Sequence, residues 1–307
     1  MLTKTLLIGS LSFVLFHAPL SAGTLAYVVS AGITGAGQLG TVDLLTGAYQ
    51  QLGPVEPDGY FGLAKGANGS LLAGTYAANL DSIDAITGVP TLIGPTGLGP
   101  CVVPSPSCGS NSYSTLGGLG GTVYATDFQN NLYTVNPTTG AASLLNGHTG
   151  LPAIPFTPGS FNPDGTINFY DEAIWGSEGK LYATFDAVVF DLSTSTVVDV
   201  LVAPELYQIN PSTGIATVIG STDLGIGAVT DLNGTPYAFN DLTSQITTIG
   251  LADGKTAFVS TFDPAAGVIQ GAVTATPEPA STALAALGLL GLVLCGYRGR
   301  RSLSGRT

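Results

Sequence analysis

The chain has 307 residues, of which 45% are hydrophobic and only 9% charged, and its formal net charge is −12. This hydrophobic content supports a substantial core, whereas charged residues usually make up about a quarter of a soluble domain. Between the two ends of the chain the only basic residues are Lys65, Lys180 and Lys255. So acidic a body cannot neutralise phosphates, which argues against nucleic acid as a partner.

Residues 1–23 have the three parts of a secretory signal peptide. Lys4 precedes an apolar run from Leu6 to Phe16, and small residues follow the run. The run is too short to span a bilayer comfortably, which disfavours the alternative of an uncleaved anchor helix. We therefore predict an exported protein, cleaved between Ala22 and Ala26.

Residues 24–275 repeat one phrase, an apolar strand, an Asn/Asp-Pro-x-Thr-Gly-like turn and a second strand that ends near a Gly. Pro fixes φ early in the turn and Gly accepts a positive φ at its end, so the phrase predicts an antiparallel hairpin. The copies are 39–53, 80–94, 132–146 and 206–220, with a degenerate copy at 245–260.

A second phrase, also two short strands, precedes most copies of the first, at 60–76, 114–128, 171–185 and 225–240. Four strands that recur about every 40 residues are typical of β-propeller blades. We predict an all-β, five-bladed propeller over 24–275, closed by pairing of 268–274 with the strand near 25–30. An insertion at 188–201 keeps a six-bladed alternative open. A β-sandwich is disfavoured because a sandwich need not repeat its sequence.

The repeats resemble bacterial extracytoplasmic propellers of the NHL, quinoprotein and WD-like superfamily. The resemblance implies the fold but no single activity, because such folds host enzymes, binders and scaffolds. Trp175 and four tyrosines occupy matching positions in successive repeats. This regularity favours packing between blades over stacking on a ligand. These tyrosines are Tyr124, Tyr182, Tyr207 and Tyr237.

Cys101 and Cys108 lie in one short loop of the sequence. A zinc site would need tighter pairs and His partners, and none are nearby. In an oxidising compartment the two thiols can form a disulfide that closes a small surface loop, and two free thiols are the alternative.

The segment 160–171 spaces oxygen ligands as a calcium loop does, with Gly165 at the bend. Its ligands would be Asn162, Asp164 and Asp171. The segment lacks flanking helices and ends in Asp where such loops have Glu, so a plain Asx/Pro turn is the alternative. Calcium is the one cofactor that the sequence leaves open.

No set of catalytic residues is recognisable in the sequence. His148 is the only His after the signal peptide, and its Asn-Gly-His-Thr-Gly setting predicts a solvated turn residue. The acidic pair Asp171–Glu172 is expected at a solvated rim. Ser-His hydrolysis and zinc catalysis therefore lack their parts, and the catalytic residues, if any, are unknown.

The C-terminal segment 276–307 has three consecutive parts. Pro277, Glu278 and Pro279 come first, and an uncharged, mostly apolar span follows from Ala280 to Tyr297. As a helix the span is roughly 27 Å long, close to the hydrocarbon thickness of a bilayer. A basic cluster then keeps the chain end in the cytoplasm and the body outside. The cluster contains Arg298, Arg300 and Arg301.

These three parts resemble a PEP-CTERM sorting signal. The resemblance implies a Gram-negative bacterium and cleavage by an exosortase-type membrane protease, its processing partner, near Pro277–Pro279. It also implies a precursor anchored in the inner membrane by a helix at 280–297, and a mature protein at the cell surface or outside the cell. Proteins with this tag are often associated with exopolysaccharide and biofilm.

Two classes of function remain. The first is a non-catalytic surface protein that binds or organises exopolysaccharide or other surface proteins. The second is an extracytoplasmic propeller enzyme that acts on polysaccharide. The absence of Arg from the body and the single His favour the first class, while enzymes that use only carboxylates keep the second open.

Overall fold

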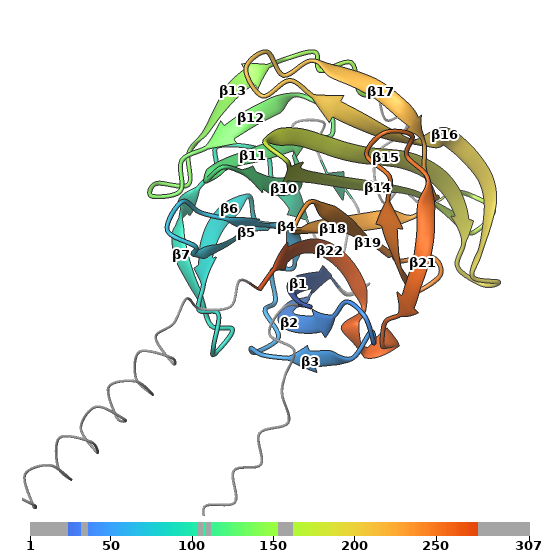
Figure 1. Cartoon of the computed structure of the whole chain (residues 1–307), viewed down its shortest axis with the longest axis horizontal. Coiled ribbons are helices and arrows are strands. Elements are labelled where there is room, and N and C mark those ends of the chain that lie inside the picture. The colour runs from blue at the N-terminus through green and yellow to red at the C-terminus, as the bar shows by residue number, and fades with distance from the viewer. Residues whose placement is uncertain (1–23, 32–35, 103–106, 109–111, 153–161, 276–307) are drawn as a thin grey trace, which may run out of the picture. The chain divides into compact units, whose positions relative to one another are not determined.

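A computed structural model of the chain describes residues 24–31, 36–102, 107–108, 112–152 and 162–275. Residues Thr24–Ala275 form one compact unit. Its described residues build five four-stranded antiparallel sheets and one two-stranded sheet. The five larger sheets are blades around a ring (Figure 1), and their inner strands contact one another in sequence. The predicted five-bladed propeller is confirmed, and the six-bladed alternative is wrong.

The strands of each blade are given from the centre of the ring outward. Blade 1 contains β22 (Val268–Thr274), β1 (Leu25–Ala31), β2 (Gly37–Asp43) and β3 (Tyr49–Gln51). Blade 2 contains β4 (Tyr60–Lys65), β5 (Leu71–Thr75), β6 (Asn79–Ile83) and β7 (Pro90–Pro95). Blade 3 contains β10 (Tyr113–Leu119), β11 (Thr122–Asp127), β12 (Leu132–Val135) and β13 (Ala142–Asn146).

Blade 4 contains β14 (Thr166–Ser177), β15 (Lys180–Asp191), β16 (Thr196–Ile209) and β17 (Ala216–Ser221). Blade 5 contains β18 (Ile226–Leu232), β19 (Thr235–Asn240), β20 (Gln245–Ile249) and β21 (Thr256–Thr261). A short 3₁₀ helix, η1 (Pro264–Ala266), leads into β22. The two-stranded sheet consists of β8 (Cys101–Val102) and β9 (Ser107–Cys108).

The ring is closed by the two ends of the body. β22 pairs antiparallel with β1, and the paired residues run from Ala26↔Thr274 to Ala31↔Val268. The closure predicted from the sequence is therefore confirmed. Because the last strand of the body completes the first blade, blade 1 gains the inner strand that its own sequence lacks.

The repeated turn phrase joins neighbouring blades. In blade 3 the side chain of Asn136 accepts hydrogen bonds from the N–H groups of Thr138 and Thr139, which fixes the turn. Gly140 follows with φ of 80°, and a Cβ there would lie 2.4 Å from the carbonyl oxygen of Gly94 in blade 2. The recurrent glycines thus allow the turn of one blade to pack on the outer strand of the preceding blade.

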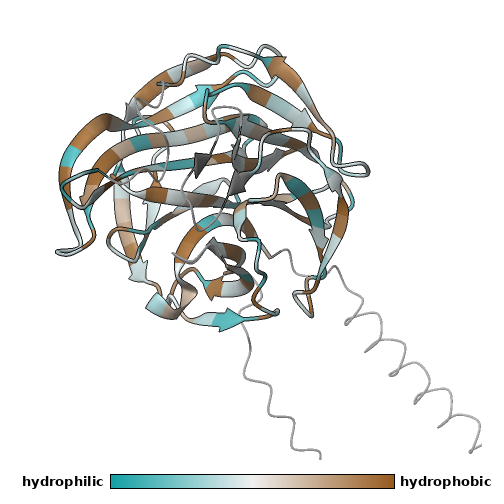
Figure 2. Cartoon of the chain, turned by 180° about the vertical axis from the view of Figure 1, so that it is seen from behind, coloured by the Kyte–Doolittle hydropathy of each residue, from teal (hydrophilic) through white to brown (hydrophobic). Residues whose placement is uncertain are grey.

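The core lies between the blades. Each of five buried apolar clusters joins two neighbouring blades, and hydrophobic residues run through the strands in Figure 2. Near the axis the inner strands approach so closely that only glycine fits. A Cβ on Gly117 would lie 2.0 Å from the carbonyl oxygen of Ile174, and one on Gly271 would lie 2.3 Å from the nitrogen of Leu63.

Blade 4 has an extension that the other blades lack, which we call the arm. It consists of Thr166–Tyr170, Ala187–Asp191 and Thr196–Val202, the outer parts of three long strands. The predicted insertion therefore lengthens existing strands and adds no blade. In the other four blades the pairing with the inner strand shifts register near its start, whereas β14 pairs with β15 without a break. The unbroken ladder carries blade 4 straight into the arm.

Candidate functional site

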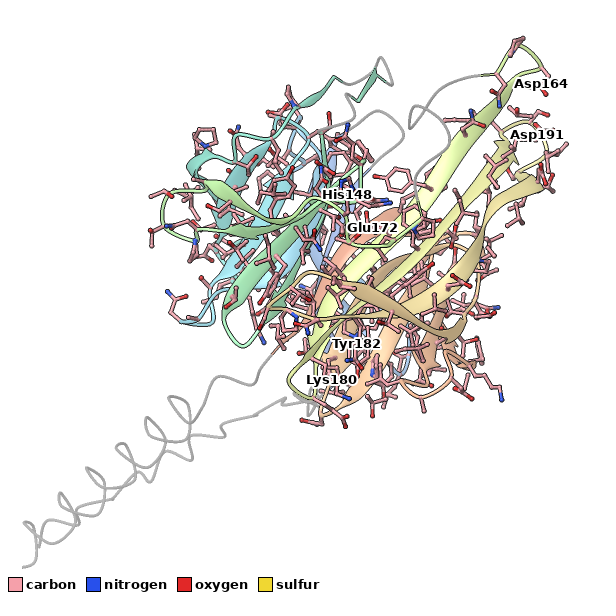
Figure 3. The ribbon with its side chains drawn as sticks, turned by 90° about the horizontal axis from the view of Figure 1, so that it is seen from above. His148, Asp164, Glu172, Lys180, Tyr182 and Asp191 are labelled. Carbon is pink, nitrogen blue, oxygen red and sulfur yellow. The ribbon has the colours of Figure 1, made fainter. Side chains whose placement is uncertain are left out.

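The two ends of the ring differ in their side chains. We call the end where the inner strands begin the upper end, and the end where they finish, β22 at Thr274, the lower end. Figure 3 shows the direction from the lower to the upper end along blade 4. Lys180 lies at the lower end, Glu172 lies higher, and Asp164 and Asp191 lie at the far end of the arm.

Three aspartates meet at the upper end, between blades 4, 5 and 1. Asp171 of β14 and Asp186 of β15 lie directly opposite each other in the ladder, so their side chains share one face of the sheet. The N–H of Gly225 in blade 5 donates to Asp186 Oδ2 at 2.8 Å. Asp241 follows β19, and its Oδ1 accepts the N–H of Ile269 in β22 at 2.9 Å. We call Asp171, Asp186 and Asp241 the aspartate cluster.

Four oxygens of the aspartate cluster are buried without a hydrogen-bond partner. They are both oxygens of Asp171, Oδ1 of Asp186 and Oδ2 of Asp241. Burial, reinforced by the charges of Asp186 and Asp241, raises the pKa of Asp171 well above its usual range. Burial also raises the pKa of Asp186 to about 7 and that of Asp241 well above its usual range. The cluster therefore retains protons near neutral pH and offers acceptor atoms that the described part of the protein leaves unused.

The repeat explains how Asp186 and Asp241 reach this place. The N–H groups of Tyr76, Phe128 and Asp241 each donate to the carbonyl of a residue just before the neighbouring inner strand. These residues, with Asp186, are the last letters of LLAGTY, VYATDF, PYAFND and LYATFD. Blades 2 and 3 thus carry an aromatic ring where blades 4 and 5 carry a carboxyl group. Sequence analysis missed this exchange, although the aligned phrases contain it.

Four aromatic rings line the other side of the upper end. The ring centroid of Phe61 lies 3.9 Å from that of Tyr76 and 6.2 Å from that of Phe128. The rings of Phe128 and Tyr170 meet edge to face at 5.1 Å. We call Tyr76, Phe61, Phe128 and Tyr170 the aromatic arc. It joins blades 2, 3 and 4, so aromatic and acidic side chains share the upper end.

Glu172 lies on the opposite face of β14 from Asp171, because successive side chains alternate along a strand. The hydroxyl of Ser114 donates to Oε2 at 2.5 Å, and the hydroxyl of Thr126 donates to Oε1 at 2.9 Å. Burial raises the pKa of Glu172 to about 7 despite these bonds. The expectation that Asp171–Glu172 forms a solvated rim is wrong, since the two residues are 2% and 6% exposed.

The three predicted calcium ligands are not brought together. The side-chain nitrogen of Asn162 donates to Thr166 and Asn168, and the side chain of Asp164 accepts from Thr166. Asp171 lies five residues after Thr166, the first residue of β14, and on an extended strand five residues span about 17 Å. The bend at Gly165 exists, but a strand follows it where a calcium loop would curl back. Within the described residues no group of three or more His, Cys, Asp or Glu side chains could hold a metal ion.

The aromatic residues and the histidine singled out in the sequence have structural positions and do not join the candidate site. Trp175 and Tyr182 stack with ring centroids 5.8 Å apart, and both are buried, as are Tyr124 and Tyr207, while Tyr237 packs against a core cluster. The prediction that these aromatics serve packing is confirmed. His148 is exposed, as expected of a turn residue.

Cys101 and Cys108 lie opposite each other in the β8–β9 pair. Such a register suits a cross-strand bond, so we expect the exported protein to contain this disulfide. Mass spectrometry of the unreduced protein should show a deficit of two hydrogens in the peptide pair. Full alkylation of both thiols without reductant would contradict the expectation.

Several predicted segments lie outside the described residues. They are the signal peptide 1–23 and the segment 276–307, with the sorting residues Pro277, Glu278, Pro279, Arg298, Arg300 and Arg301 and the helix 280–297. Among the residues that the structure does describe, no helix has the length and apolar character needed to cross a bilayer.

Comparison with solved structures found chains of low identity that resemble part of this one. A PQQ-bound aldose sugar dehydrogenase from Streptomyces coelicolor is 17% identical over 66% of this chain and 60% of its own, with a TM-score of 0.38. A protein of unknown function from Bacteroides thetaiotaomicron is 12% identical over 75% and 57%, with a TM-score of 0.39. The Dos1 propeller is 12% identical over 76% and 60%, with a TM-score of 0.34. The chain thus spans about three fifths of each.

No curated protein matches the chain by sequence. The PEP-CTERM protein-sorting motif matches residues 275–301, directly after the closing strand β22. This motif implies an exported protein that is processed by an exosortase and sorted to the cell surface. The chain therefore carries a C-terminal PEP-CTERM sorting motif behind a five-bladed β-propeller body.

Proposed function

We propose that the chain is a non-catalytic binding protein of the cell surface that holds matrix polysaccharide at the upper end of its ring. The observation that carries this proposal is the set of unpartnered carboxyl oxygens in the aspartate cluster, beside the aromatic arc. The partly exposed members of the two groups are Asp241, Tyr76 and Tyr170. A sugar at this end would hydrogen-bond to Asp241 and pack an apolar ring face on the tyrosines. A few polar groups among aromatic ones are typical of ligand sites.

The placement of the carboxyl groups supports binding over hydrolysis. A glycosidase needs two carboxyl groups that flank one glycosidic bond. Here Asp171 and Glu172 are directed to opposite faces of β14, and both oxygens of Glu172 already accept hydroxyl hydrogen bonds. The pair is therefore poorly arranged to act on one bond.

The binding proposal is tested with the full chain in detergent, by affinity electrophoresis against a panel of polysaccharides that includes the host's own. Retention should weaken about ten-fold, or about 1.4 kcal/mol, in Asp241→Asn and in Phe128→Leu. Lys180→Ala, at the lower end, is the matched control and should bind as the parent does. Absence of retention by every polysaccharide would refute the proposal.

An enzyme that acts on polysaccharide is the second candidate, and one observation favours it. A carboxyl group with a pKa near 7, such as Glu172, is protonated often enough at neutral pH to serve as a general acid. The same panel distinguishes the two functions. Release of reducing ends by the parent protein, lost in Glu172→Gln, would establish catalysis in place of plain binding.

The sorting signal gives a prediction about processing. Prolines keep residues 277–279 extended, which suits a protease active site, and the arginines hold the tail in the inner membrane. Protein recovered from the host surface should therefore end near Pro279. Glu278→Ala and loss of the basic cluster should each leave full-length precursor in the membrane. An unprocessed C-terminus at Thr307 on the surface protein would contradict this expectation.

A further inference from the structure

The body of the protein carries a large unbalanced negative charge. Residues 24–275 contain three lysines and no arginine, against nearly all of the chain's 20 acidic residues. One of the lysines, Lys255, pairs with Asp253 at 3.2 Å. Lys65 ends β4 and Lys180 begins β15, so neither lies at the upper end. Such a body repels a polymer that carries acid groups and attracts one that carries basic groups.

Part of this charge lies beside the aromatic arc. The loop before β4 contains Glu56 and Asp58, and the N–H of Glu56 donates to the carbonyl of Gly37 at 2.7 Å, where β2 starts at the upper end. The carbonyl of the next residue after Asp58, Gly59, accepts the N–H of Tyr76 at 2.9 Å. Acidic side chains and the first ring of the arc therefore adjoin where the chain enters blade 2.

Asp81 of β6 joins Glu56 and Asp58, and we call the three the carboxylate triad. Burial, reinforced by the charges of Glu56 and Asp58, raises the pKa of Asp81, so the three groups are close enough to repel one another. All three are partly or fully exposed. A positive group from a ligand can therefore reach the triad and offset this repulsion.

The aspartate cluster has the same need at blade 5. Asp241 is partly exposed, and its charge is one of those that raise the pKa of Asp171. Asp171 is 2% exposed, and neither of its oxygens has a hydrogen-bond partner in the described residues. A neutral hydroxyl at Asp241 supplies a donor alone, whereas an ammonium group supplies donors and a positive charge that buried carboxyls feel with little screening.

The aromatic arc suits the same chemistry. Tyr76 and Tyr170 are its partly exposed members. An ammonium group within about 6 Å of a tyrosine ring centre is attracted to the negative face of the ring. Carboxyl groups and tyrosines at the upper end thus favour one kind of sugar substituent.

We propose that the polysaccharide bound at the upper end carries free amino groups, which lie as ammonium ions beside the carboxylate triad and Asp241. This inference rests on the proposed function, because it names the class of polymer that the same site binds. Polymers rich in carboxylate or sulfate groups are repelled by the same side chains.

The test compares an oligomer of glucosamine with its N-acetylated form of equal length. N-acetylation removes the positive charges and leaves the sugar rings and their hydroxyls in place. Affinity is measured by isothermal titration calorimetry with the full chain in detergent at about pH 6, where amino groups are protonated and exposed carboxyl groups are ionised. The parent should bind the glucosamine oligomer about ten-fold more tightly, as expected for a few exposed ion pairs.

Two double variants locate the preference. Glu56→Gln with Asp58→Asn should reduce it to about two-fold and leave the affinity for the N-acetylated oligomer unchanged. The matched control is Glu178→Gln with Asp84→Asn, which removes the same charge from exposed turns after β14 and β6. The control should retain the parent's preference. Unchanged thermal unfolding confirms that each variant is folded.

Equal affinity of the parent for the two oligomers would overturn the inference and leave the proposed function standing. Equal loss of preference in both double variants would also overturn it, since it would reveal a general charge effect. Binding of a lysine oligomer as tight as that of the glucosamine oligomer would overturn it in favour of a basic peptide. Failure to bind any polysaccharide would refute the proposed function together with the inference.

Discussion

The free energy of unfolding should fall as the pH rises from about 4 to about 8. Burial raises the pKa values of Asp186 and Glu172 to about 7 and raises those of Asp171 and Asp241 well above their usual range. In this window the folded state binds more protons than the unfolded state. The stabilisation that these groups contribute is therefore fully present below their pKa in the unfolded state, and it is lost as the pH rises through their pKa in the folded state. Each group contributes a slope of up to about 1.4 kcal/mol per pH unit.

Replacing aspartates of the aspartate cluster by asparagine should weaken the dependence of the unfolding free energy on pH. Asp171→Asn with Asp186→Asn imitates the protonated pair and retains an acceptor for the N–H of Gly225. Thermal unfolding of this variant from about pH 4 to pH 8 should show little slope from these two groups, and a gain in stability at the upper limit on the order of 4 kcal/mol. Asp164→Asn, in the exposed turn before β14, is the control. A parent protein that is more stable at pH 8 than at pH 5 would refute the assignment.

Gly117→Ala should destabilise the ring by about 3 kcal/mol or more, at the upper end of the usual cost of overpacking. The new Cβ would lie 2.0 Å from the carbonyl oxygen of Ile174 and 2.6 Å from its carbon. Those atoms are backbone of the next inner strand, so two blades must separate to make room. The midpoint of urea unfolding should fall while its slope m stays unchanged.

Gly147→Ala is the matched control for this variant. A Cβ at Gly147 would meet only the side-chain oxygen of Asn131 at 3.6 Å, an ordinary contact. Neither glycine has a positive φ, so the two variants differ in packing and not in backbone strain. The control should stay within about 0.5 kcal/mol of the parent. Equal effects of the two substitutions would contradict the close approach of the inner strands.

The blade count and the ring closure could be predicted because the repeat is defined by residues that form a turn through local interactions. Asn136 and Gly140 determine their turn regardless of what surrounds it. An Asn or Asp followed four residues later by Gly recurs in four blades. The missing first phrase of blade 1 then identifies β22 as its partner. The arm could not be predicted, because an insertion of strand-forming residues does not say whether it builds a new sheet or lengthens an old one.

The candidate site was largely invisible in the sequence. Asp171 and Glu172 look like a charged surface pair, and only the position of β14 between two neighbours buries both of them. The grouping of Asp171, Asp186 and Asp241 depends on pairing between strands and on contact between blades, neither of which a single sequence states. Calcium ligand spacing was misleading for a related reason, since a loop pattern and a strand can share the same letters.

The closing strand has a consequence for the order of folding. A chain exported from its N-terminus delivers β1, β2 and β3 first and β22 last, so the pairing of Ala26 with Thr274 joins nearly the whole length of the body. Contacts at such separation form slowly. Until they form, β1 presents an open strand edge that can pair with other chains or be cut by proteases. Because the sorting motif follows β22 directly, export delivers the motif only after the strand that closes the ring.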